Sequence, residues 1–133
     1  MARTLTVAAL LLTFATGAQA RDNGQWATDD PAQQAIVHWY QHLMQPDAPD
    51  VSCCGEADAY WCDGIHVRED KTYCTITDDR PDAPLGRPHV KIGTEIFIPN
   101  HKLKWDEGNP TGHAIVFLST GGYVWCFVQG TGG

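Results

Sequence analysis

Cysteine is the residue type in this sequence with the widest choice of chemistry, from disulfide formation to nucleophilic attack. The chain has five: Cys53, Cys54, Cys62, Cys74 and Cys126. Adjacent cysteines rarely bond each other, because the ring so formed strains the peptide between them. We therefore expect Cys126 to pair with Cys53 or Cys54, and Cys62 to pair with Cys74 across a hairpin. One thiol is then left over, and it can be free, intermolecular or catalytic.

The catalytic alternative uses Cys54 as a nucleophile and His113 as its base. Residues 52–60 can form a single helical turn that begins near Cys54, and the N-terminus of a helix lowers the pKa of a thiol. His113 follows a glycine and opens an apolar strand, which places an imidazole at a strand end. For a third polar group that would hold the imidazole, the nearest late candidate is Gln129.

These pieces resemble the papain-like cell-wall hydrolases of the NlpC and CHAP types. In that family a nucleophilic cysteine starts a helix, a Gly-x-x-Ile/Val-Phe strand follows, and a Gly-His strand carries the base. The corresponding pieces here are Cys54, residues 93–97 and residues 112–118. The resemblance implies a hydrolase of peptide or cell-wall bonds with Cys54 as nucleophile and His113 as base.

A second pattern resembles a set of small exported bacterial proteins that have no assigned function. The pattern is Cys-Cys-x-x-Ala-Asp, then Gly-Asn-Pro-x-Gly, then Cys-Phe-Val near a glycine-rich end. It falls here on residues 53–58, 108–112 and 126–128. The resemblance implies a shared fold without implying an activity, and it favours a structural disulfide for Cys126.

Two histidines offer a metal-binding alternative. His38 and His42 are four residues apart in a predicted helix, on its glutamine-rich face, so both imidazoles can point at one ion. Glu56, Asp58 or a nearby thiol would have to complete the site, and a solvated polar face explains the same spacing. We expect both histidines to be exposed and to hold no metal at physiological concentrations, and we expect no cofactor.

Aromatic residues in loop segments are the candidates for ligand binding. Trp26 and Trp105 lie outside the predicted strands, and an exposed aromatic ring in an exported protein can stack on a sugar or a peptide. The segment 99–112 is long enough that a compact domain would normally give it a task, and it also carries His101 and Asn109. The alternative is that the rings close the ends of a small core.

The net charge and the N-terminal residues indicate where the protein resides and which classes of partner it excludes. Residues 1–20 combine one charge, an apolar stretch and an Ala-Gln-Ala ending, which predicts a signal peptide and a mature domain of 21–133. The net charge is −7, and it becomes one unit more negative without Arg3. We therefore expect a periplasmic or secreted protein that binds no nucleic acid and does not insert into a membrane after cleavage.

The pattern of apolar residues predicts one helix followed by strands. Asp30-Pro31 starts a helix over 31–45 that carries an apolar stripe at helical spacing: Ala32, Ala35, Ile36, Trp39, Tyr40 and Leu43. Alternating residues predict a hairpin over 61–77. Strand-like runs follow over 90–98, and a second hairpin joins 113–119 to 123–129. We expect an α+β domain in which the N-terminal helix packs on a small antiparallel, curved or barrel-like sheet held by disulfides, with loose ends at 21–29 and 130–133.

Three functional hypotheses are compatible with these patterns. The leading one is an exported, disulfide-stapled domain that binds a protein, peptide or glycan through Trp105, Asn109, His101 and Trp26. The second is a cysteine hydrolase that uses Cys54 and His113, and the third is metal binding by His38 and His42. An oligomer linked through the odd cysteine is compatible with the first hypothesis.

Overall fold

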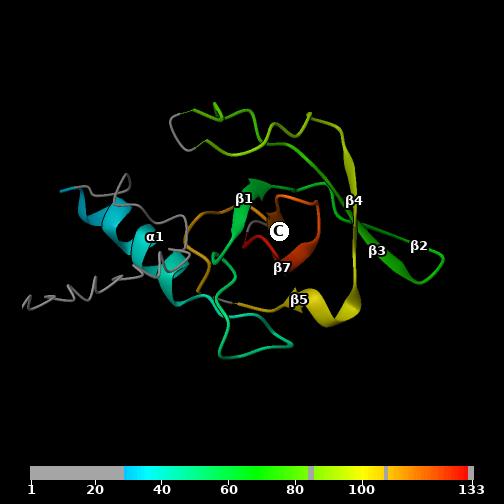
Figure 1. Cartoon of the computed structure of the whole chain (residues 1–133), viewed down its shortest axis with the longest axis horizontal. Coiled ribbons are helices and arrows are strands. Elements are labelled where there is room, and N and C mark those ends of the chain that lie inside the picture. The colour runs from blue at the N-terminus through cyan, green and yellow to red at the C-terminus, as the bar shows by residue number, and fades with distance from the viewer. Residues whose placement is uncertain (1–28, 84–85, 107, 132–133) are drawn as a thin grey trace, which may run out of the picture.

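The computed structural model describes residues 29–83, 86–106 and 108–131. The predicted signal peptide, residues 21–28 and Trp26 lie outside the described residues. Within the described parts, the chain forms one α-helix and two small β-sheets, and two disulfides join its elements. Figure 1 shows helix α1 on one side of the molecule and the hairpin of β2 and β3 on the other. The α+β class is confirmed.

Helix α1 spans Pro31–His42 and begins where the sequence predicts. The side chain of Asp30 accepts a hydrogen bond from the backbone of Ala32, and proline occupies the first turn, where it costs no hydrogen bond. The predicted end at residue 45 is wrong. Leu43 is already extended, and its carbonyl accepts a hydrogen bond from the backbone N–H of Cys53 at 2.8 Å, which ends the helical ladder.

The larger sheet has the strand order β1-β6-β7-β5. Strands β1 (Ala57–Trp61), β6 (Ile115–Ser119) and β7 (Val124–Val128) are antiparallel, while β5 (Leu103–Lys104) runs parallel to β7. The second predicted hairpin is thereby confirmed. The helical turn predicted over 52–60 is wrong, because residues 57–61 pair along their whole length with β6.

The smaller sheet has the order β2-β3-β4, built from His66–Arg68, Lys71–Thr75 and Glu95–Ile98. The two sheets do not close into a barrel within the described residues. Side chains occupy the outer edge of β1 in place of another strand. The carboxylate of Asp78 accepts from the backbone N–H of Trp61, and the guanidinium of Arg87 donates to the carbonyl of Ala59.

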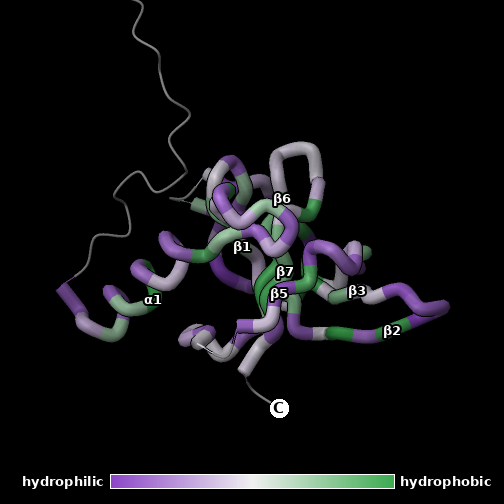
Figure 2. Tube along the Cα trace, turned by 90° about the horizontal axis from the view of Figure 1, so that it is seen from below, coloured by the Kyte–Doolittle hydropathy of each residue, from purple (hydrophilic) through white to green (hydrophobic). Residues whose placement is uncertain are grey.

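The core is divided between the two faces of the larger sheet. Along β6, Val116 and Leu118 pack into one cluster, and Ile115 and Phe117 pack into the other. This double burial explains why β6 is apolar at successive positions rather than at alternate ones. In Figure 2 the green strands accordingly lie at the centre, with α1 to one side.

Helix α1 touches this core only through its C-terminal part. Tyr40 packs edge-on against Phe117, with 6.0 Å between ring centroids, and Trp39 packs beside it. No residue of α1 is fully buried. The predicted apolar stripe is therefore covered at one end, while Ala32 and Ala35 are exposed.

Candidate functional site

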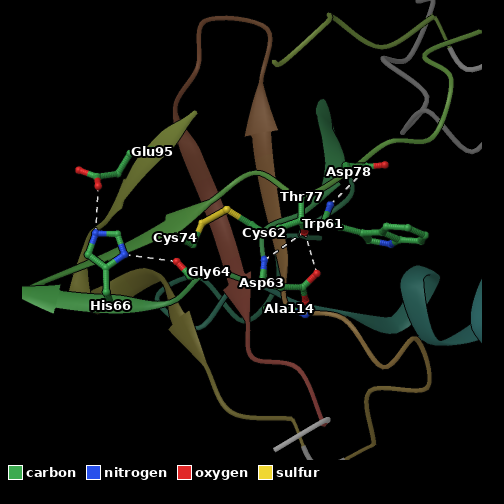
Figure 3. The surroundings of a disulfide bond; sticks show 10 residues. All are labelled: Trp61, Cys62, Asp63, Gly64, His66, Cys74, Thr77, Asp78, Glu95 and Ala114. Atoms are coloured by element: carbon green, nitrogen blue, oxygen red, sulfur yellow. Dashed lines mark hydrogen bonds and ion pairs between the residues drawn. A yellow bond between two sulfur atoms is a disulfide. The ribbon is translucent and has the colours of Figure 1, made fainter. Parts of the chain in front are cut away.

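The disulfides account for four of the five cysteines. Cys53 bonds Cys126 and Cys62 bonds Cys74, with Cα–Cα distances of 5.6 and 5.4 Å. The first bond joins the segment after α1 to β7, and the second joins the smaller sheet to the end of β1, as Figure 3 shows. Cys54 remains a thiol. The sequence predicted the second pair and left the first open between Cys53 and Cys54.

The half-buried thiol of Cys54 faces the end of helix α1. Its Sγ donates to the backbone carbonyl of Tyr40 at 3.4 Å, and its backbone N–H donates to Oγ of Ser52. Strand β1 rather than a helical turn follows this segment. The helix dipole that was expected to lower the pKa of the thiol is therefore not present at this position.

His113 lies just before β6, and its imidazole is held by two contacts. Its ring stacks on Trp61 with 3.8 Å between centroids, and its Nδ1 lies 2.9 Å from a carboxylate oxygen of Asp63. A carboxylate only accepts hydrogen bonds, so Nδ1 carries the proton and donates it. The Nδ1 side of the ring is therefore turned towards Asp63.

Asp63 is the polar group that orients His113, and sequence reasoning missed it. The carboxylate of Asp63 also accepts from Oγ1 of Thr77 at 2.7 Å and from the backbone N–H of Ala114 at 2.8 Å (Figure 3). Partial burial alone would raise the pKa of Asp63, but the hydrogen bonds from Thr77 and His113 outweigh it and lower the pKa. Fifty residues separate Asp63 from His113, so no local pattern links them.

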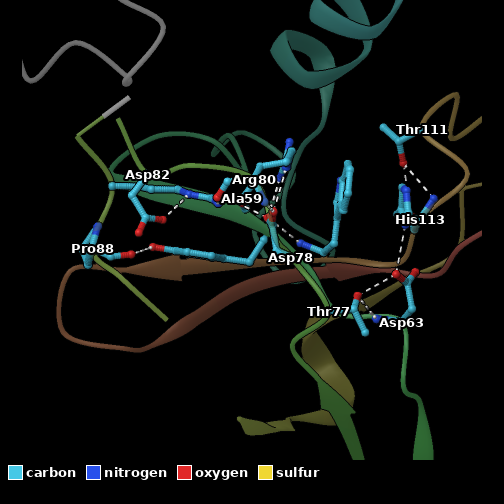
Figure 4. A network of polar contacts seen from close by, with 12 residues as sticks. Ala59, Asp63, Thr77, Asp78, Arg80, Asp82, Pro88, Thr111 and His113 are labelled. Carbon is cyan, nitrogen blue, oxygen red and sulfur yellow. Dashed lines mark hydrogen bonds and ion pairs between the residues drawn. The ribbon is translucent and has the colours of Figure 1, made fainter. Parts of the chain in front are cut away.

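Trp61 is enclosed between His113 and Arg80. The guanidinium of Arg80 lies 4.3 Å from the centre of the indole, and Figure 4 shows Arg80 well apart from His113. Both groups stack on one ring yet are separated from each other, so they cover opposite faces of Trp61. Burial raises the pKa of the nearby Tyr40 hydroxyl, and the positive charge of Arg80 opposes that rise. This stack joins α1, β1 and the 78–88 loop.

The two histidines proposed for metal binding are exposed, as predicted. Their rings stack on each other with 4.1 Å between centroids. Nδ1 of His42 donates to the carbonyl of His38 at 2.8 Å, which leaves Nε2 of His42 as a ligand atom. In the described ranges no group of three histidine, cysteine or acidic side chains is placed to hold an ion.

Among the residues that the structure describes, Trp105 is the most exposed large apolar side chain, at 84 %. Its neighbours in the chain are fixed by hydrogen bonds on both sides. With its amide oriented to satisfy both neighbours, the side chain of Gln129 donates to the carbonyl of Lys104 and accepts from the backbone N–H of Asp106. These two bonds tie the chain just beyond β5 to the residue that follows β7, while the indole of Trp105 stays in solvent.

Asn109 is the residue that organises the rest of the 99–112 segment. Its amide nitrogen donates to the carbonyls of His113 and Gln129, and its oxygen accepts from the backbone and hydroxyl of Thr111. All four hydrogen bonds that an asparagine side chain can make are used within the protein. Asn109 is 4 % exposed, so its geometry favours a structural role in this segment over direct ligand contact.

The remaining binding candidate, His101, is exposed in a short 3-10 helix, η1 (Asn100–Lys102). The next residue, Lys102, is tied to the segment after α1. Its Nζ lies 3.0 Å from the side chain of Gln45 and 2.8 Å from that of Asp47. Lys102 therefore joins the 99–112 segment to the chain that follows α1, more than fifty positions away in the sequence.

The outer face of the smaller sheet carries a second aromatic row, which was not expected from the sequence. His66, Tyr73 and Phe97 are opposite one another in register, with ring centroids 5.6 and 5.7 Å apart. The carboxylate of Glu95 pairs with both His66 and Arg68. Alternation of polar and aromatic residues along β3 and β4 was the available signal. These cross-strand contacts themselves stabilise a small sheet.

Among the described residues, no helix has the length and apolar character needed to span a membrane. No protein-family model, curated protein or solved structure matches the chain.

Proposed function

We propose that this protein is an extracytoplasmic binding domain that captures a protein, peptide or glycan partner with Trp105 as its anchor. The observation that carries the proposal is the contrast at this residue. The indole is 84 % exposed, while the backbone on both sides of it is hydrogen-bonded to Gln129. A large ring held out by a fixed backbone loses little conformational entropy on binding.

The energetics of protein interfaces favour tryptophan as a binding anchor. Tryptophan is enriched among the few residues that contribute most of the free energy of binding at interfaces. Burying an indole removes a large apolar surface from water, and its N–H can still donate to a partner. The two disulfides are typical of proteins that meet an oxidising environment, which supports an exported location.

Site-specific photo-crosslinking tests the proposal. A photoreactive phenylalanine analogue is placed at position 105 in one sample and at position 123 in another, in the exported protein of intact cells. Tyr123 is the matched control, because it is 76 % exposed on the turn between β6 and β7. We expect one reproducible set of adducts from position 105 that is absent from position 123.

Competition and a glycan assay complete the experiment. Excess unlabelled protein should suppress the adducts, whereas the Trp105→Ala variant should compete at least about tenfold less well, as for an interface anchor. Pelleting with purified cell-wall sacculi distinguishes a glycan from a protein partner. Equal adducts at the two positions, or full competition by Trp105→Ala, would rule out Trp105 as the anchor.

A further inference from the structure

Helix α1 and the segment that follows β5 are joined by a side-chain hydrogen bond. Nε1 of Trp39 donates to Oδ2 of Asp106 over 3.1 Å, across 67 positions of the sequence. In Figure 1 the segment after β5 runs back towards the C-terminal end of α1. Asp106 directly follows Trp105, so this bond fixes the chain immediately beside the exposed indole.

Asp106 also organises the turn that follows it. Its other carboxylate oxygen accepts from the backbone N–H of Gly108 at 2.9 Å, and its carbonyl accepts from the backbone N–H of Asn109 at 3.3 Å. Its own backbone N–H donates to Gln129. Asp106 thus links the indole of Trp39 with the turn, and a change at Trp39 reaches the backbone of Trp105 through one carboxylate.

From these contacts we infer that Trp39 is a positioning residue for Trp105, so that the docking of helix α1 sets the orientation of the anchor. The inference rests on the proposed function, and it adds that helix α1 determines how the anchor of that same site is oriented. Because no residue of α1 is fully buried, the half-buried Trp39 and Tyr40 are the helix residues that fix it against the core. A helix held in this way passes its displacement to Asp106.

Trp39→Phe is the informative substitution, because it keeps an aromatic ring against Tyr40 and removes the N–H donor. Trp125→Phe is its matched control, since Trp125 packs against Gly55 rather than against Asp106. Hydrogen exchange measured by NMR reports on the turn. We expect the amides of Gly108 and Asn109 to exchange about fivefold faster in Trp39→Phe and to be unchanged in the control, as for the loss of one hydrogen bond.

A fluorine label distinguishes positioning from a general loss of stability. Protein made with 5-fluorotryptophan gives a fluorine resonance for each indole, and the signal of Trp105 is assigned with Trp105→Phe. The Trp105 resonance should shift and narrow in Trp39→Phe while the urea midpoint stays near that of Trp125→Phe. A second variant, Asp106→Ala, should cause the same shift, and combining it with Trp39→Phe should add nothing further.

The outcomes separate this inference from the proposed function. If the exchange rates and the Trp105 resonance change but crosslinking at position 105 captures nothing in protein that retains Trp39, the positioning holds and the binding function fails. If Trp105→Ala competes poorly for the adducts while Trp39→Phe alters neither the resonance nor the amide exchange, the positioning role is wrong. Additive effects of Trp39→Phe and Asp106→Ala would also contradict it, because each would then act through other contacts.

Discussion

Asp78 and Arg87 form an ion pair inside the protein, with 2.7 Å between the carboxylate and the guanidinium and side chains that are 1 % and 2 % exposed. Arg80 contacts the same carboxylate at 2.6 Å. Together they hold residues 78–80 and Arg87 against the edge of β1, where Asp78 also accepts from the backbone of Trp61. Burial opposes the charges, and the mutual hydrogen bonds lower the pKa of Asp78 and raise that of Arg87.

Asp78→Asn should strongly destabilise the fold. The substitution removes the buried carboxylate that pairs with Arg87 and leaves Arg87 with the less buried Asp82. Breaking a buried ion pair typically costs about 3 kcal/mol. The free energy of unfolding, measured in urea at pH 7, checks this. Asp79→Asn is the control, because Asp79 is exposed and should change stability by less than about 0.5 kcal/mol. Equal effects of the two substitutions would contradict the buried role of Asp78.

The stability of the fold should fall in acid, and Asp78 should account for part of the fall. A carboxyl whose pKa is lower in the folded than in the unfolded state stabilises the fold above its unfolded pKa, near 4, and this contribution is lost as the pH falls below that value. The pKa values of Asp63 and Asp78 are both lowered by their hydrogen bonds. Urea midpoints at pH 7, 5 and 3 should decline less steeply in Asp78→Asn. An unchanged slope would show that Asp78 does not drive the acid response.

Asp70→Gly should stabilise the β2–β3 hairpin. Glu69 and Asp70 both have positive φ, at 52° and 60°, which non-glycine residues adopt at a cost. Glycine at the second turn position removes that cost, and we expect a gain of about 0.5 to 1 kcal/mol. Thermal unfolding measures the change. Lys71→Gly, one residue further into β3, should instead lower the melting temperature, so a gain from both substitutions would contradict the turn argument.

The elements that the sequence predicted well are those with local signals. The Asp30-Pro31 start of α1 and the turn between β6 and β7 each depend on a few neighbouring residues. Strand β1 was missed because it begins with Ala-Asp-Ala, which has little strand preference. Pairing with β6 decides its conformation. Pairing across the chain likewise decides between Cys53 and Cys54 as the partner of Cys126.

The candidate sites divide in the same way. Trp105 was identified because a tryptophan outside the predicted strands can be recognised from the sequence alone. Its supports were missed or assigned otherwise: Trp39 was placed in the apolar stripe of the helix, and Gln129 was considered only as a partner of His113. Both residues lie far from Trp105 in the sequence. Trp39 contacts Asp106 and Gln129 contacts Lys104, the two neighbours of Trp105, and only the folded arrangement brings them together.

His38 and His42 should bind zinc no more tightly than two exposed imidazoles allow. Their rings stack on each other, and the described residues supply no third ligand beside them. Structural zinc sites need four ligands, so we expect dissociation at micromolar zinc and no change in melting temperature on adding it. Calorimetric titration of the unmodified protein and of His38→Ala checks this. Stoichiometric zinc that is lost in His38→Ala would promote the metal-binding hypothesis.

The reactivity of Cys54 decides whether the hydrolase hypothesis survives. A nucleophilic thiol in a cysteine hydrolase must be reduced, ionised at neutral pH and within hydrogen-bond reach of its base. The thiol of Cys54 donates to the carbonyl of Tyr40, whereas the imidazole of His113 is stacked on Trp61 and bonded to Asp63. We therefore expect iodoacetamide to label Cys54 slowly at pH 7, and His113→Ala to leave the rate unchanged.

Mass mapping without reduction provides the measurement, because it also shows that the other four cysteines stay in their two disulfides. Labelling in urea is the control, since an unfolded Cys54 should react at the rate of a simple thiol. Asp63→Asn separates the two roles of His113. If Asp63 and His113 activate Cys54, Asp63→Asn and His113→Ala should each slow its labelling. If the two residues are structural, Asp63→Asn should lower only the free energy of unfolding. Rapid, stoichiometric labelling of Cys54 that both substitutions abolish would establish a working thiol, imidazole and carboxylate, and the binding proposal would then have to give way to hydrolysis.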